Sequence, residues 1–207
     1  KTVAIRECGL DYFHLMDRPY FHNPPQPSLI LREGESSKFP PLSARGGSGL
    51  AGKRGGEEGL WIREAKQRQE KTFRSHLDFA EELDLPLILH CRGSVADPGD
   101  AYNDMLAILR EYVAAGKLKR GGSIHCFTAT LPIAQRYVAL GFHVGFTGVI
   151  TFKGAERYAE VIRGLPLGKI LVETDCPYLT PAPHRGKRNE PLYVRFTAEK
   201  VAEILGR

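Results

Sequence analysis

The sequence has four cysteines but no C-x-x-C pair, and it contains no segment that resembles a secretory signal and no long apolar run. The cysteines are Cys8, Cys91, Cys126 and Cys176. Their spacing argues against a zinc ribbon or a thioredoxin-type redox site. Residues 1–8 carry two cations and no apolar stretch of signal length, and no apolar run approaches the roughly 20 residues that span a bilayer. We therefore expect reduced thiols in a cytoplasmic protein without a membrane partner.

The composition is typical of a globular chain. The 207 residues have 42% hydrophobic content, which is enough for one large core or two small ones. Lysine and arginine total 29 against 24 aspartates and glutamates, giving a formal net charge of +5. This mild excess suits an anionic partner but does not identify one.

Residues 16–60 differ in composition from the rest of the chain. They contain six prolines, followed by the run "ARGGSGLAGKRGG" at 44–56. Such a segment buries too little apolar surface to offset the entropy lost on ordering it. We expect a flexible insertion at 16–60 within a single domain that spans residues 1–207.

Strand-like and helix-like segments alternate through the remaining sequence. Apolar runs of strand length occur at 1–7, 85–91, 121–127, 142–148 and 169–175. Helical patterns occur at 61–83, 101–115, 131–141, 154–162 and 192–205. This alternation is typical of parallel βαβ units, and both a doubly wound open sheet and a TIM barrel fit it.

Polar side chains stand at or near the ends of four of these five strands. They are Glu7, His90, His125, and the pair Glu173 and Asp175. In a (β/α)8 barrel the carboxyl ends of the strands face one shared bowl, where such residues can converge on a cation. The pattern therefore favours a TIM-like barrel with a metal site.

Each of these residues has a simpler interpretation when taken alone. A histidine at the end of an apolar strand is more often a core residue, and a strand-terminal glutamate such as Glu7 more often caps a helix. Their joint placement favours the metal site. His22, His76 and His143 lack that placement, so we interpret them as surface or packing residues.

Two histidines with two or more carboxylates form a mixed nitrogen and oxygen ligand set. Such a set suits Zn²⁺, Mn²⁺ or Fe²⁺ and also tolerates Mg²⁺, so it does not identify the metal. Because no thiolate ligand is needed, we interpret Cys91, Cys126 and Cys176 as small apolar residues that pack behind the ligands.

A basic loop, "PAPHRGKRNEP" at 181–191, follows the last acidic pair. The planar guanidinium of Arg185 can bind a phosphate group, and Arg92 is a second candidate of the same kind. An isolated stretch of this composition would more often be a solvated loop, but its position beside Asp175 favours the phosphate interpretation.

Five segments together resemble the TatD family of metal-dependent deoxyribonucleases. They are "ECGLDY" (7–12), "LPLILHCR" (85–92), "IHCF" (124–127), "GFTG" (145–148) and "ETDCPYLTPAPHRGKRNEP" (173–191). The resemblance covers residues 1–15 and about 65–205. It implies a TIM-like barrel, one or two divalent ions (Mg, Mn or Zn), and hydrolysis of phosphodiester bonds in DNA, often from a 3′ end.

The resemblance also implies roles for individual residues. The metal ligands would be Glu7, His90, His125 and Asp175. Asp175 would in addition hold the nucleophilic water, and it is the best candidate for the general base. Glu173 would support the catalytic site, while His184 and Arg185 resemble the substrate-side pair of the family.

The sequence departs from the family pattern in two ways. Family members open with a strand that ends in Asp-x-His-x-His, whose histidines bind metal, and this motif is absent here. A barrel of this type has about 250 residues. We therefore expect an incomplete barrel that lacks the first one or two βα units. The second departure is the segment 16–60, where the family pattern predicts a much shorter link.

Two rival functions stay open at this stage. One is an amidohydrolase-like enzyme that cleaves an ester or an amide, such as aminoacyl-tRNA, with water activated in the same way. The other is an inactive truncated barrel that binds nucleic acid or nothing. The basic residues after Asp175 favour a substrate that carries phosphate.

Overall fold

The computed structural model describes residues 5–13 and 54–207, and the strands in these ranges form one parallel sheet. The strands are β1 (Ile5–Asp11), β2 (Leu87–Arg92), β3 (Gly122–His125), β4 (His143–Phe146) and β5 (Ile170–Val172). They lie side by side in sequence order, and every neighbouring pair is parallel. The predicted α/β class and the five strands are confirmed.

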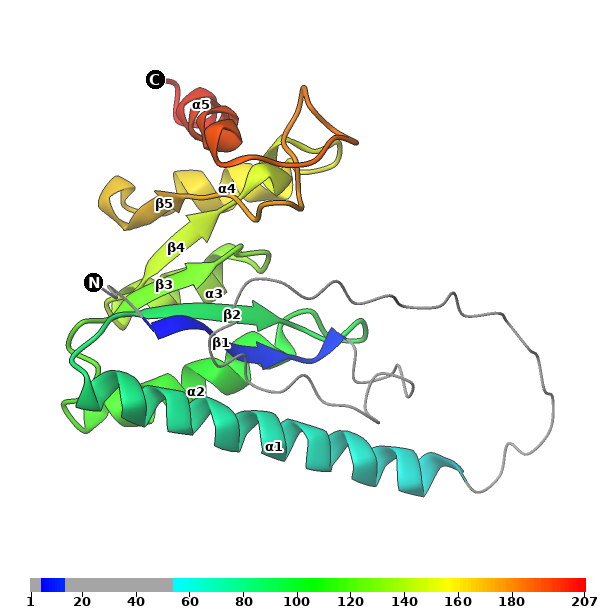
Figure 1. Ribbon diagram of the computed structural model, residues 1–207, viewed down its shortest axis with the longest axis vertical. Coiled ribbons are helices and arrows are strands. Elements are labelled where there is room, and N and C mark those ends of the chain that lie inside the picture. The colour runs from blue at the N-terminus through cyan, green and yellow to red at the C-terminus, as the bar shows by residue number, and fades with distance from the viewer. Residues whose placement is uncertain (1–4, 14–53) are drawn as a thin grey trace, which may run out of the picture.

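Helices connect the strands and cover the sheet. The α-helices are α1 (Arg54–Glu82), α2 (Asp100–Ala114), α3 (Leu131–Ala139), α4 (Arg157–Arg163) and α5 (Val194–Ile204). Figure 1 shows the sheet rising from β1, which lies above α1, to β5, with α5 at the opposite end of the molecule. No helix in the described ranges is long and apolar enough to cross a membrane.

The buried side chains account for the packing of helix against sheet. On β2, Leu87, Leu89 and Cys91 alternate with less buried residues, as expected where one face of a strand points into the core. On α1, Phe73 and Leu77 lie four residues apart and are almost fully buried. The 3.6-residue period of the helix thus presents one apolar stripe to the sheet.

Two predicted boundaries were wrong. The first strand does not end at Glu7 but continues to Asp11, with an irregular register between Ile5 and Cys8. Residues 54–60, expected to be part of the flexible insertion, form the first turns of α1. The glycines in this stretch have poor helix propensity, so the local sequence did not indicate a helix there. The rest of the predicted insertion, 16–53, lies outside the described residues.

The outer strands of the sheet are β1 and β5. The run at 169–175 suggested a buried strand, but Val172 retains 39% of its exposed surface and β5 is only three residues long. Within the described part of the chain, β5 pairs only with β4, so its other edge has no neighbouring strand to cover it.

Candidate metal centre

The register of the sheet brings the two predicted histidines together. His90 on β2 and His125 on β3 are paired residues of adjacent parallel strands. Both lie at or near the carboxyl ends of their strands, because β2 ends at Arg92 and β3 at His125. Gly9 of β1 is the partner of His90 on the other side, and a Cβ there would lie 1.7 Å from the His90 carbonyl oxygen. Only glycine permits this close approach.

His90 lies between two carboxylates of β1. Its Nδ1 is 3.5 Å from Oε1 of Glu7, and its Nε2 is 3.5 Å from Oδ2 of Asp11. Burial disfavours the charged imidazole, but the two carboxylates outweigh burial and raise the pKa of His90 to about 9. Despite opposing burial, interactions with His90 hold the pKa of Asp11 below its usual value.

His125 has the same arrangement with residues that follow β5. Its Nε2 is 3.4 Å from Oδ1 of Asp175, and its Nδ1 is 3.0 Å from Oε1 of Glu173. The carboxylates of Asp175 and Glu173 raise the pKa of His125 to about 10, against the effect of burial. Each histidine is thus the centre of a carboxylate–imidazole–carboxylate triad.

The two triads determine how the donors fit a metal ion. In each triad the carboxylates contact opposite nitrogens of the ring, so they do not point at a common centre. Accordingly, the described residues contain no group of three or more His, Cys, Asp or Glu side chains arranged around an ion. The structure joins Glu7 to His90 and Asp175 to His125, and the convergence of these four residues on a single ion stays a prediction.

The donor chemistry nevertheless fits a divalent cation. Imidazole nitrogens and carboxylate oxygens are the ligands that Zn²⁺ and Mn²⁺ accept. Both histidines carry raised pKa values because each faces concentrated negative charge, and a cation placed there would meet the same charge. Metal binding at this end of the sheet would compete with the protons on His90 and His125.

Glu173 is anchored more firmly than a free ligand would be. Its Oε1 accepts a hydrogen bond of 2.6 Å from the backbone N–H of Cys126 as well as contacting His125. Cys126 adopts φ of +46°, a conformation that non-glycine residues seldom adopt. Gly145 makes room for the carboxylate, because a Cβ there would lie 2.5 Å from Oε1 of Glu173. This geometry suits a residue that orients His125 through Nδ1, while Nε2 faces Asp175.

Sequence reasoning missed Asp11 and its support from α1. The side-chain amide of Gln69 donates to the carbonyl oxygen of Asp11 at 2.7 Å and accepts from its N–H at 2.9 Å. The amide thereby takes the place of a neighbouring strand at the end of β1. Asp11 could have been found, because it lies in the quoted "ECGLDY" four positions after Glu7, on the same face of a regular strand. Gln69 carries no such signal, since it is one of many polar residues on α1.

Of the proposed phosphate-binding residues, Arg92 is the last residue of β2 and Arg185 lies on the loop after β5. The Arg92 guanidinium stacks on the ring of Phe13, with Cζ 3.6 Å from the ring centroid. The Arg185 guanidinium stacks on Phe152 at 3.5 Å and donates to the carbonyl oxygen of Thr180 at 2.8 Å. Both guanidiniums are therefore held in fixed orientations, with further N–H groups available to an anion.

His184 lies in an aromatic cluster at the end of the same loop. Its ring stacks on Tyr193 with a centroid distance of 4.4 Å and an interplanar angle of 7°, and it also contacts Phe196. The structure thus shows a packing contact for His184, and its role toward a substrate stays a prediction.

All four cysteines lie in the described ranges and none forms a disulfide. Cys8 and Cys91 are buried in the core. Burial raises the pKa of the Cys126 thiol to about 11 and that of Cys91 well above its usual value. Thiols in this state are poor nucleophiles.

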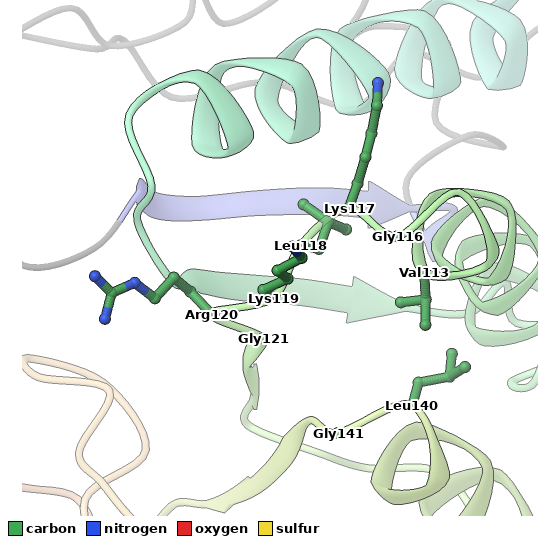
Figure 2. Close-up of a pocket in the computed structure, with 9 residues that line it drawn as sticks. All are labelled: Val113, Gly116, Lys117, Leu118, Lys119, Arg120, Gly121, Leu140 and Gly141. Carbon is green, nitrogen blue, oxygen red and sulfur yellow. The ribbon is translucent and has the colours of Figure 1, made fainter.

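A hollow of about 310 Å³ lies at the opposite end of the sheet. Its lining comes from the segments before β3 and β4, including Val113, Leu118, Lys119 and Leu140. Figure 2 shows Val113 and Leu140 pointing toward each other and Lys117 extending toward α1. The Lys117 ammonium lies 3.8 Å from Asp78. The hollow therefore lies away from the histidines and is not part of the metal centre.

Comparison with known proteins identifies related sequences. Residues 51–207 match the family model of the TatD-related DNases. The metal-dependent hydrolase YcfH of Escherichia coli is 43% identical over 154 residues, which are 73% of this chain and 54% of that protein. YabD of Bacillus subtilis, also described as an uncharacterized metal-dependent hydrolase, is 41% identical over 72% of this chain and 56% of its own length.

One relative carries a more specific name. The protein called 3′-5′ ssDNA/RNA exonuclease TatD in Escherichia fergusonii is 34% identical over 68% of this chain and 52% of its own length. Among solved structures, the TatD homologue YJJV of E. coli aligns with a TM-score of 0.59 and 30% identity, covering 68% of this chain and 50% of that one. The chain spans about half the length of the curated relatives it matches.

Proposed function

Because the chain belongs to the family of TatD-related DNases, we propose that it is a divalent-metal-dependent hydrolase that cleaves phosphodiester bonds in DNA. The observation that carries the proposal is the pair of neighbouring histidines, His90 and His125, each flanked by two carboxylates at the carboxyl end of a parallel sheet. The name of the E. fergusonii relative supports attack on a single strand from its 3′ end.

His90, His125, Glu7 and Asp175 would hold one or two ions. When bound, a divalent ion would lower the pKa of a water molecule and polarise a phosphoryl oxygen of the substrate. The identity of the metal, whether Mg, Mn or Zn, is left to experiment because the donor set accepts all three.

The side chains of the chain supply the remaining parts of the reaction. Asp175 accepts a proton from the attacking water, and its partial exposure leaves it accessible to substrate. Glu173 keeps the Nδ1 side of His125 occupied and so fixes the ring. Arg185 and Arg92 bind phosphate groups of the strand, and His184 contacts the substrate from the same loop as Arg185.

The decisive experiment measures hydrolysis of two substrates side by side. A single-stranded oligodeoxynucleotide with a free 3′ end and an aminoacyl ester would each be incubated with the purified chain in Mg²⁺, Mn²⁺ or Zn²⁺, and again in excess chelator. We expect cleavage of the oligonucleotide that needs the metal. Cleavage of the ester alone would support the amidohydrolase-like alternative. Binding of the strand without cleavage would support a non-catalytic role.

The location and assembly of the protein stay predictions. The absence of disulfides agrees with a reducing compartment, and we propose the cytoplasm. Size-exclusion chromatography with light scattering would determine the oligomeric state. An enzyme that needs a second copy to cover the edge of β5 would elute above the mass of one chain.

A further inference from the structure

The most exposed aromatic side chain in the described residues is Tyr178, which retains 70% of its exposed surface. It lies three residues after Asp175, on the loop that also carries His184 and Arg185. The nearest comparison is Phe79 on α1, which is 50% exposed and lies far along the chain from the metal centre. Tyr178 is thus a large, solvent-exposed ring close in sequence to Asp175, the proposed general base.

The backbone that carries this ring is fixed at three points. The N–H of Tyr178 donates to the carbonyl oxygen of Asp175 at 2.7 Å. Its carbonyl oxygen accepts a hydrogen bond of 2.6 Å from the side-chain amide of Asn189, which is only 2% exposed. The N–H of Asn189 in turn donates to the carbonyl oxygen of Pro177 at 3.0 Å.

A second set of contacts closes the loop beyond Tyr178. Thr180 is buried and its hydroxyl donates to the carbonyl oxygen of Lys187. Arg185 donates to the carbonyl oxygen of Thr180. The exposure of Tyr178 therefore does not come from a loose loop; a rigid loop holds the ring in solvent.

We propose that the ring of Tyr178 is a stacking platform for a nucleobase of the substrate strand. The proposal rests on the proposed function, and it names a residue that would read bases where Arg185 and Arg92 read phosphates. Every base has a flat apolar face, so stacking on tyrosine adds affinity for single strands with little preference among sequences. Because the backbone around Tyr178 is already held by hydrogen bonds, the loop loses little entropy on binding, which suits a residue that must engage each new base as the strand shortens.

The test measures binding separately from cleavage. A fluorescein-labelled single-stranded oligodeoxynucleotide and a strand of equal length made of abasic sites would be titrated with the full chain in chelator, and anisotropy would give each Kd. We expect Tyr178→Leu to weaken binding of the base-containing strand roughly tenfold and to leave the abasic strand unchanged. Tyr178→Phe should bind both strands like the unaltered chain, because stacking needs the ring and not the hydroxyl group.

Phe79→Leu is the matched control, since it also removes an exposed ring but on the outer side of α1. It should change neither Kd. The proposal is overturned if Tyr178→Leu weakens both strands equally, if it weakens neither, or if the unaltered chain does not distinguish the two strands.

Hydrolysis in a divalent metal is then measured on the same base-containing strand. If the chain cleaves no strand but keeps the base-dependent loss with Tyr178→Leu, the stacking proposal stands and the proposed function falls. If the chain cleaves the strand and Tyr178→Leu leaves both the Kd and KM unchanged, the proposed function stands and stacking is overturned.

Discussion

Both ends of the parallel sheet contain charge pairs, but the pairs differ in residue type and in exposure to solvent. At the carboxyl end, His90 and His125 each contact two carboxylates, and both rings are at least two-thirds covered. At the amino end, Lys117 and Arg120 pair with Asp78 and Asp84 on the open surface.

The chemistry of the partners explains what this difference means. Lysine and arginine are charged at any physiological pH, so their exposed pairs with acids change little and contribute little. A histidine pressed against two carboxylates is held in a protonation state that it would not adopt alone, and such perturbed groups gather at functional sites. The comparison therefore supports the proposal that the functional site lies at the carboxyl end, whereas the charge pairs at the amino end contribute little.

Removing one charge at each end of the sheet tests whether the two ends differ in function, and it should give the largest difference in activity. We expect Asp175→Asn to lower kcat/KM on single-stranded DNA by about 10²–10⁴-fold, because the amide cannot accept the proton from water. Arg120→Gln, which removes the pair with Asp84 at the amino end, should leave kcat/KM unchanged. Equal losses in both variants, measured in the same metal, would show that the two ends do not differ in function.

The next largest effect tests the anchored carboxylate. Glu173→Gln removes the charge that faces Nδ1 of His125, and we expect metal affinity to fall about 10–100-fold. Gly145→Ala should act in the same direction, because its Cβ would displace the Glu173 carboxylate. Gly168→Ala is the control, since a Cβ there meets nothing within 4 Å. Isothermal titration with Mn²⁺ measures all three, and unaltered affinity in Glu173→Gln would remove Glu173 from the site.

A smaller effect is expected at the basic loop. Arg185→Ala should raise KM about tenfold with a smaller change in kcat, if the guanidinium binds phosphate equally in the ground and transition states. The KM of Arg185→Lys should lie between those of the unaltered chain and of Arg185→Ala. A lysine ammonium keeps the positive charge but lacks the planar guanidinium that donates two parallel hydrogen bonds. Arg195→Ala is the matched control, because Arg195 also stacks on a ring, that of Phe196, but on α5. A loss confined to kcat would move Arg185 from binding to catalysis.

The sequence predicted the frame of the site better than its contacts. His90 and His125 could be placed side by side because apolar runs of strand length that alternate with helices specify parallel strands, and the carboxyl ends of parallel strands share an edge. The strand length of β1 could not be found, since residues beyond Glu7 include Gly9, which usually indicates a turn. In the structure Gly9 instead allows β1 to approach His90 closely.

The missed contacts depend on tertiary structure. Gln69 reaches Asp11 across 58 residues of sequence, and no local pattern marks it among the polar residues of α1. The positive φ of Cys126 accompanies a hydrogen bond from its N–H to the carboxylate of Glu173, 47 residues later. A pattern of apolar periods reports which face of an element is buried, and it does not report which polar group on another element completes a hydrogen bond.

The last prediction concerns a small, pH-dependent change in the free energy of unfolding. Asp100 begins α2, next to the loop that follows β2, and its carboxylate accepts hydrogen bonds from the N–H groups of Ser94 and Ala101 and from the Lys66 ammonium. Burial alone would raise the pKa of Asp100, but these hydrogen bonds outweigh it and lower the pKa below its usual value.

A carboxylate with a lowered pKa stabilises the folded state above its unfolded pKa of about 3.9, and this stability is lost as pH falls through the folded value. We therefore expect Asp100→Asn to cost about 1 kcal/mol of unfolding free energy at pH 7, and the cost to shrink below about pH 4. Urea unfolding at both pH values measures the difference, with Asp84→Asn as the comparison: Arg120 also lowers the pKa of Asp84, but this pair is open to solvent, so its pH-dependent loss should be smaller. A cost for Asp100→Asn that stays constant between the two pH values would mean that the carboxylate acts through its shape alone, and the electrostatic contrast between the two ends of the sheet would then be confined to the histidines.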